Sequence, residues 1–356
     1  MASAAVTGAA EDWVGLAARA RARRRWTTAT LYAFLVLTAL PVLVPYFWLF
    51  TISVSATSGS AETFVLWRAV AILAPAVFAF GALQIRFTER RPLIIGRLLI
   101  GGATLLALAV FVGPFLHEEN YRFLWNPDIV EDLRGKSGAG GQFPWVWTAF
   151  ANSLLLAGVH TLAVVTVATL AGYYASRFAF RGRALFLQSL LVLHAFPAIT
   201  LIIPIFLIVY WVGLLDTIVG VVLVIVTLEL PFSIFIMKGF FDAVPWDIEM
   251  SAMTDGASRR QAFVLVVVPQ VKVGMLAIGI FAFLKGWEEY VFVRTLLFEK
   301  SNWVMSLYLF WVADDIMGVD YGIVAAVGVL YVLPSLLLFI FAQKYLVQMT
   351  VGGIKG

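Results

Sequence analysis

The amino-acid sequence predicts an all-α integral membrane protein with about eight transmembrane helices. Of its 356 residues, 62% are hydrophobic and only 13% are charged, whereas charged residues make up about a quarter of a soluble globular protein. The apolar residues gather in long runs, and a helix needs about 20 of them to cross a bilayer. The mean hydropathy of +0.94 agrees with this pattern. What remains between the runs is too short for a soluble enzyme domain of ordinary size.

Eight apolar runs, bounded by charged residues or by Pro and Gly clusters, are the candidate spans. In chain order they cover residues 31–50, 64–82, 93–116, 147–175, 184–212, 217–237, 271–293 and 321–346. Pro197 and Pro204 lie within the fifth run and predict a kink in it. The first run follows an arginine-rich segment and lacks a convincing cleavage site, so we interpret it as a retained anchor.

The distribution of basic residues predicts the orientation. If the N-terminus is cytoplasmic, most of the 25 Lys and Arg residues fall on the cytoplasmic side, as the positive-inside rule requires. Both termini are then cytoplasmic, and we expect a multi-pass protein of the bacterial plasma (inner) membrane. The expected parts are a cytoplasmic segment (1–30), three spans (31–116), an extracytoplasmic loop (117–145), a core (146–346) that contains a cytoplasmic loop (239–270), and a cytoplasmic tail (347–356).

Several kinds of site are excluded by residue content. The chain has no cysteine and only three histidines, so a disulfide framework, a thiolate nucleophile and a thiolate metal site are ruled out. Gly135-Lys136-Ser137 resembles part of a P-loop, but Val130 stands where that motif needs its first glycine. The formal net charge of +4 follows from topology and does not indicate a nucleic-acid partner. No metal or cofactor is expected on this chain.

The loop between the sixth and seventh runs is too long for a simple connection. Pro245 suits a first helical position, and Asp247 and Glu249 place negative charge in the first turn, where the helix dipole favours it. Gly256 can adopt the left-handed conformation that ends a helix. The pattern predicts a short helix, a tight turn, and a second helix that Pro269 ends. Small side chains leave part of this hairpin free to press against another protein.

The loop also carries a recognisable order of residues, Ala252, Asp255-Gly256-Ala257, Phe263 and Pro269. This order resembles the EAA loop of ABC-importer permeases, in which Glu-Ala-Ala precedes Asp-Gly-Ala and then Phe and Pro at fixed distances. Asn152-Ser153-Leu154, Phe196-Pro197, Lys238-Gly239-Phe240-Phe241 and the terminal residues 350–356 extend the likeness. Over roughly 145–356 the chain resembles the smaller permease of the maltose-type carbohydrate importers.

The sequence differs from the family pattern in two respects. The glutamate of the motif falls on Met250 and its first alanine on Ser251, while Glu249 stands one residue early. The spans near 64–82 and 93–116 are additional to the six that such permeases usually have. The fold implied is therefore a six-helix type I importer core with two extra N-terminal spans.

The resemblance implies a division of labour among several chains. The partners would be a second, homologous permease, two cytoplasmic ATPase subunits, an extracytoplasmic solute-binding protein, and a sugar-like solute such as an oligosaccharide, a disaccharide or a polyol. ATP and Mg would bind the partner ATPases, and this chain would be a transport subunit in the lipid bilayer. The ATPase-coupling residues would be Glu249, Ser251, Ala252, Asp255, Gly256, Ala257, Phe263 and Pro269, and Gly352, Gly353 and Lys355 of the tail would reach between the ATPases.

Polar residues within the spans are candidates for the translocation path, because a charge in the bilayer needs a partner or water. Glu229 lies mid-span and either lines this path or forms a buried structural pair. Lys285 lies three residues before Glu288 and four before Glu289 on one helix face, which predicts that it pairs with one of them. Trp287 could stack on sugar rings or anchor the interface, and Asn152 could face solute or bond to a neighbouring helix.

Two other functions are considered. A proton-coupled secondary transporter could use Glu229 as its carrier, but it would need internal repeats, which we do not find, and it would leave the hairpin unexplained. An intramembrane enzyme would need a nucleophile or metal motif that the sequence lacks. The importer subunit therefore remains the leading hypothesis.

Overall fold

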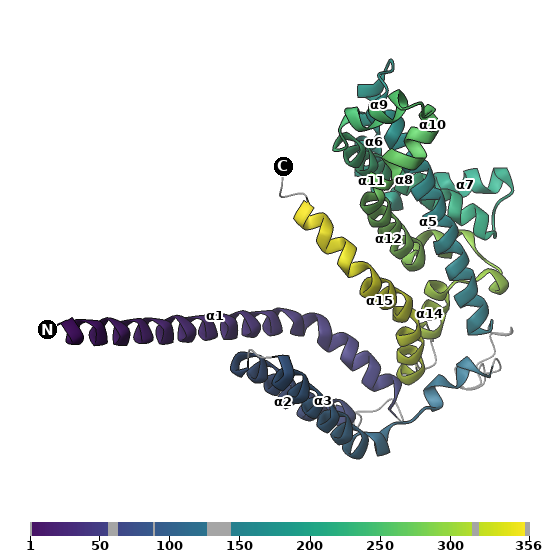
Figure 1. The fold of residues 1–356 in the computed structure, drawn as a ribbon. Helices are drawn as coiled ribbons and strands as arrows, with labels where there is room; N and C mark the ends of the chain where they lie inside the picture. The colour runs from purple at the N-terminus through teal and green to yellow at the C-terminus, as the bar shows by residue number, and fades with distance from the viewer. Residues whose placement is uncertain (1, 56–62, 88–89, 127–143, 315–319, 353–356) are drawn as a thin grey trace. The chain divides into compact units, whose positions relative to one another are not determined.

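The computed structural model describes residues 2–55, 63–87, 90–126, 144–314 and 320–352 (Figure 1). Within these ranges every regular element is a helix, which confirms the all-α prediction. The chain divides into two compact units, one made of Met1–Arg122 with Asp320–Val329 and the other of Phe123–Val319 with Leu330–Gly356. They are described in turn as unit 1 and unit 2.

Unit 1 holds the N-terminal helices. These are α1 (Ala2–Ser53), α2 (Thr63–Arg86), α3 (Arg90–Phe111) and the 3-10 turn η1 (Gly113–Phe115), followed by the start of η2 (Glu119–Leu124). The helix α1 is continuous over 52 residues, so the arginine-rich segment and the first span belong to one helix. Its apolar part, Thr30–Ser53, is long enough to cross a membrane, as are Val65–Gln84 of α2 and Arg90–Phe111 of α3. The two extra spans are thus α2 and α3.

Unit 2 contains the elements that position the candidate site. They are α5 (Val146–Arg177), α6 (Arg183–Ala195), η3 (Ala198–Leu201), α7 (Ile202–Val212), α8 (Ile218–Asp242), α9 (Trp246–Thr254), α10 (Arg259–Gln261), the π-helical η4 (Ala262–Val267), α11 (Val268–Gln270), α12 (Lys272–Glu288), α13 (Val291–Leu296), η5 (Lys300–Asn302), α14 (Met305–Ala313) and most of α15 (Tyr321–Gly352). The long helices α5, α8 and α12 pack against one another, with α9 and α10 at one end (Figure 1).

The number of spans agrees with the sequence. Six helices of the described residues are long and apolar enough to cross a membrane, and the number rises to eight when each of two bent helix pairs forms one span. Both bent pairs lie in unit 2. The prediction of about eight transmembrane helices is confirmed in this sense.

The predicted fifth span, 184–212, is not one kinked helix. Two segments, Arg183–Ala195 and Ala198–Val212, meet there at 91°. Between them Phe196 has the extended backbone (ψ 131°) that a following proline imposes, and Pro197 itself cannot donate a helical hydrogen bond. Pro204 lies within α7 and causes no second break among the described residues.

The predicted seventh span, 271–293, is also corrected. Its helix α12 ends at Glu288, and Val291–Leu296 forms the separate short helix α13. The preceding segment, Arg259–Gln270, meets α12 at 71°. Pro269 does not end the preceding helix, because the helical segment Arg259–Gln270 continues past it. The break follows at Val271 instead.

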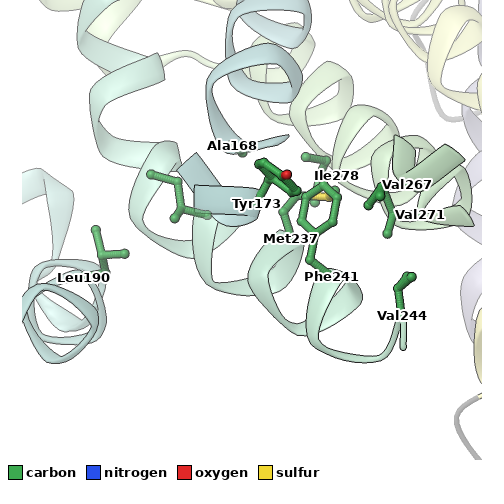
Figure 2. Packing of buried hydrophobic residues seen from close by; sticks show 10 residues of the cluster. Ala168, Tyr173, Leu190, Met237, Phe241, Val244, Val267, Val271 and Ile278 are labelled. Carbon is green, nitrogen blue, oxygen red and sulfur yellow. The ribbon is translucent and has the colours of Figure 1, made fainter. Parts of the chain in front are cut away.

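A hydrophobic core joins these helices near α9. Figure 2 shows Tyr173 of α5 close to Met237 and Phe241 of α8, with Val267 and Ile278 beside them. Gly172 allows α5 and α8 to approach closely, because a Cβ atom there would lie only 2.8 Å from Cβ of Met237. This close contact of backbones is how helices in membranes gain packing energy. The α9 end of unit 2 is consequently a dense core.

Candidate coupling hairpin

The first half of the hairpin forms as its sequence predicts. Pro245 caps α9 and stands one residue before its first turn. Gly256 has a φ of +96°, the left-handed conformation that only glycine adopts without strain. The turn is closed by the backbone N–H of Ala257, which donates to the carbonyl oxygen of Ala252 at 3.0 Å. The short helix and its left-handed end are therefore confirmed.

The second half differs from the predicted regular helix. It begins with a capping box in which the Ser258 hydroxyl accepts from the Gln261 N–H and the Gln261 side chain accepts from the Ser258 N–H. The chain then enters the π-helical η4 and continues into α11. Widened turns of this kind are frequent at functional positions of helices.

Glu249 points into the protein. Its side chain lies on α9 but is only 1% exposed. The Tyr173 hydroxyl donates to Glu249 Oε1 at 2.5 Å, and Arg177 Nε lies 3.2 Å from Glu249 Oε2. Tyr173 and Arg177 are four residues apart in the last turns of α5, and so face the same side of that helix. We call these three residues the Glu249 anchor.

The Arg177 side chain extends this connection. It donates to the Val244 carbonyl oxygen at 2.9 Å, just before α9. Its guanidinium also lies over the Trp246 ring, 5.3 Å from the ring centroid. Arg177 therefore holds α5 to the entry of α9 as well as to Glu249. The sequence signal for this role is a Tyr and an Arg four residues apart at the end of a predicted span.

The predicted coupling residues fall into two groups by position. Ala252, Ala257 and Phe263 are half-buried, and Phe263 packs on Tyr173 with 4.4 Å between ring centroids. The exposed members are Ser251, Asp255, Gly256 and Pro269. The hairpin thus has an inner side, centred on the Glu249 anchor, and an outer side of mostly small residues.

Asn152 and Trp287, two residues predicted for the translocation path, make contacts that pack helices together. The Asn152 amide donates to the carbonyl oxygens of Ser301 and Trp303, at 2.8 and 3.0 Å. It thereby ties the start of α5 to the loop before α14. Trp287 is buried and donates to the Tyr331 carbonyl oxygen at 3.0 Å. Both residues have partners within unit 2.

The charged path candidates lie on exposed or half-exposed helix faces. Glu229 of α8 is half-buried, and Lys285 of α12 is near enough to act on its carboxylate. Glu288 and Lys285 are exposed. The predicted pairing of Lys285 with Glu288 or Glu289 is wrong for the described part of the chain, where no ion pair within 4.0 Å joins Lys285 to either carboxylate.

The helix α15 extends to Gly352, whereas Gly353 and Lys355 lie outside the described residues. The same holds for Gly135-Lys136-Ser137. Among the residues that the structure does describe, no three His, Asp or Glu side chains are grouped so that they could hold a metal ion.

Residues 164–350, more than half of the chain, match the family model described as "Binding-protein-dependent transport system inner membrane component". The chain belongs to this family. The resemblance to an ABC importer permease is confirmed, and the permease is a multi-pass membrane transport subunit, not an enzyme.

Individual relatives agree with the family. The inner membrane ABC transporter permease protein YcjP of Escherichia coli (strain K12) is 30% identical over 242 residues, which are 67% of this chain and 80% of that protein. The diacetylchitobiose uptake system permease protein DasC of Streptomyces coelicolor is 30% identical and covers 59% and 76%. The trehalose transport system permease protein SugB of Mycobacterium tuberculosis is 29% identical and covers 59% and 77%.

A solved structure supports the fold. The crystal structure of a bacterial ABC transporter involved in the import of the acidic polysaccharide alginate contains a chain that aligns with a TM-score of 0.61 at 19% identity. The alignment covers 89% of the permease and 95% of that chain. At this identity the likeness concerns the arrangement of helices.

Proposed function

We propose that the permease forms half of the translocation path of an ATP-driven importer for a carbohydrate, and that α9 couples this path to cytoplasmic ATPases. The permeases named for diacetylchitobiose and trehalose support a sugar or oligosaccharide as the solute. The observation that carries the coupling proposal is the Glu249 anchor, because it joins an exposed hairpin to a membrane-spanning helix through a buried ion pair.

The anchor provides a route by which movement enters the membrane. A force on α9 acts on α5 through Glu249, Tyr173 and Arg177. Because α5 packs along α8 and α12, the three helices would tilt as one body. Tyr173 belongs to both the anchor and the hydrophobic core (Figure 2), so the hairpin has little freedom to move alone. Discrete movements of packed elements are the usual basis of such switching.

The translocation path would lie beside the charged faces of α8 and α12. Glu229, Lys285 and Glu288 are polar groups at membrane depth that the described part of the chain leaves without close ion pairs. Water and a hydroxyl-rich solute would satisfy such groups. A second, homologous permease would supply the opposite wall, and alternating access would follow from tilting of the two helix bodies.

The remaining parts of the assembly follow from this arrangement. Two ATPase subunits, which bind ATP and Mg, would receive the hairpins of the two permeases on the cytoplasmic side. The termini would then be cytoplasmic, and an extracytoplasmic binding protein would deliver the solute. Gly352, Gly353 and Lys355 would extend toward the cleft between the ATPases.

Reconstitution of the complete transporter tests the proposal. Proteoliposomes are prepared that contain both permeases, the ATPases and the loaded binding protein. They should accumulate labelled sugar only when ATP is present on the side of the membrane that the ATPases face. The Gly256→Asp variant should lose this uptake, because it strains the turn and places a second carboxylate beside Asp255. Solute accumulation by the permease alone, driven by a proton gradient without ATP, would contradict the proposal.

A further inference from the structure

We propose that α9 docks on its ATPase through an apolar contact centred on Trp246 and Met250, and that the ATPase groove facing Met250 is apolar. This inference rests on the proposed function and specifies the chemistry of the partner surface. It follows from the burial and pairing of Glu249, the only glutamate of α9.

The first step is that the Glu249 carboxylate already has its bonding partners within the permease. It accepts from Tyr173 and pairs with Arg177, both within α5, and the Glu249 side chain is 1% exposed. To reach a cation on another protein, it would have to leave a buried arginine unpaired, which is costly. Glu249 therefore stabilises the hairpin from within and makes no contact with a docked subunit.

The second step is the composition of the outer face. Trp246, Met250 and Thr254 follow one another at intervals of four residues, so they line one side of α9. Trp246 is 42% exposed and Met250 is 39% exposed. These are large apolar side chains on a helix that is too short and polar to be a membrane span. Exposed aromatic and other large apolar side chains of this kind are typical centres of protein interfaces.

The third step is that Trp246 is fixed before docking. The Arg177 guanidinium covers one side of its ring, so the indole does not need to be ordered when a partner binds. Little conformational entropy is then lost on association. Met250, by contrast, is flexible and fits a range of apolar surfaces.

The fourth step concerns the charges near this face. Asp247 lies in the first turn of α9, where the helix dipole favours a carboxylate without any partner. Arg259 lies over the Phe178 ring, 5.0 Å from its centroid. In the EAA motif the glutamate falls on Met250, so this permease presents a thioether where the motif has a charge. A groove with a buried cation opposite Met250 would leave that cation unpaired, which excludes it energetically.

The test uses the complete transporter, purified in lipid nanodiscs through a tag on this chain. The co-purified subunit that carries a Walker motif is identified by mass spectrometry, and its ratio to the permease is measured after washes of increasing ionic strength. The variants are Met250→Glu, with Met250→Leu as the size-matched apolar control, and Trp246→Ala, with Asp247→Asn as the control for an ionic contact. Elution volume and thermal unfolding of the permease show that each variant is folded.

We expect Met250→Glu to weaken ATPase retention by roughly tenfold or more, because it buries an unpaired charge. Met250→Leu and Asp247→Asn should retain the ATPase, Trp246→Ala should lose much of it, and high salt should leave the wild-type complex intact, since apolar contacts are not screened. If Met250→Glu retains the ATPase as well as or better than the wild type, or if high salt removes the ATPase from the wild-type complex, the apolar contact is overturned. Either result leaves the proposed function standing. If the folded wild-type permease retains no ATPase and transports without ATP, the proposed function itself fails.

Discussion

Arg177 and Glu249 form a buried ion pair, with 3.2 Å between Nε and Oε2, that joins the last turn of α5 to the first turns of α9. The two residues lie more than seventy positions apart in the sequence. Because the pair is shielded from water, each charge depends on the other. This pair turns the EAA hairpin from a flexible connection into an extension of a membrane-spanning helix.

Neutralising one member of the Arg177–Glu249 pair should therefore lower the stability of the permease more than neutralising both. Glu249→Gln keeps a polar group for Tyr173 but leaves Arg177 as a buried, unpaired cation, and breaking such a pair costs about 3–5 kcal/mol. The double variant Glu249→Gln with Arg177→Gln should recover part of this loss. Thermal unfolding of the purified permease and protease cleavage within residues 245–270 measure the effect. If the single and double variants are equally stable, the pair is not a coupled unit.

The Tyr173 hydroxyl should contribute separately from its ring. Tyr173→Phe removes the donor to Glu249 and keeps the aromatic packing with Phe241 and Phe263. A hydrogen bond to a charged group is worth about 1.5–3 kcal/mol, so stability and ATP-dependent uptake should fall. Tyr174→Phe is the matched control, because Tyr174 is 49% exposed. Equal behaviour of the two variants in thermal unfolding would show that the anchor needs no hydroxyl.

The sequence predicts the helical fold and the hairpin because both depend on local patterns. Apolar runs determine the spans, and Pro245 and Gly256 determine where α9 begins and ends. The position of Glu249 could not be predicted in this way. The motif placed it one residue out of register, and only the packing of α9 on α5 decides that it faces inward.

The two corrected spans have the same explanation. A proline within an apolar run predicts a bend, but its size depends on what the two segments pack against. The apolar runs and their prolines predict neither the 91° size of the break at Phe196-Pro197 nor the displacement of the second break to Val271. Asn152 and Trp287 illustrate the same point for polar groups, since their carbonyl acceptors lie on segments far away in the sequence.

The turn after α9 should tolerate glycine alone. Gly256 has a φ of +96°, and no atom lies within 4 Å of a Cβ placed there, so any cost of Gly256→Ala is conformational. A left-handed alanine costs about 1–2 kcal/mol. We expect lower thermal stability of the hairpin and reduced ATP-dependent uptake. Gly239→Ala, at an open helical position of α8, should be neutral or slightly stabilising. A Gly256→Ala variant as active and stable as Gly239→Ala would contradict the coupling role of this turn.

The approach of α5 to α8 should be sensitive to added volume at one position. A Cβ at Gly172 would lie 2.8 Å from Met237 Cβ and 2.9 Å from the Lys238 backbone nitrogen, so Gly172→Ala forces the helices apart. Overpacking of this kind costs about 1–3 kcal/mol. Gly158→Ala, in the same helix with nothing within 4 Å, is the control. Thermal unfolding should separate the two variants, and equal melting temperatures would mean that the close approach of α5 and α8 at Gly172 does not limit stability.

The charge on Glu229 should matter for transport and not for assembly. The residue is half-buried on α8, near the positive charge of Lys285 on α12. Glu229→Gln keeps the size and removes the negative charge, so a polar solute would meet an unbalanced positive field at membrane depth. ATP-dependent uptake should fall while ATPase retention stays normal, and Glu118→Gln, at an exposed position outside the spans, should change neither. Normal uptake by Glu229→Gln would remove this residue from the translocation path, and lost assembly would instead assign it to the contact between the two permeases.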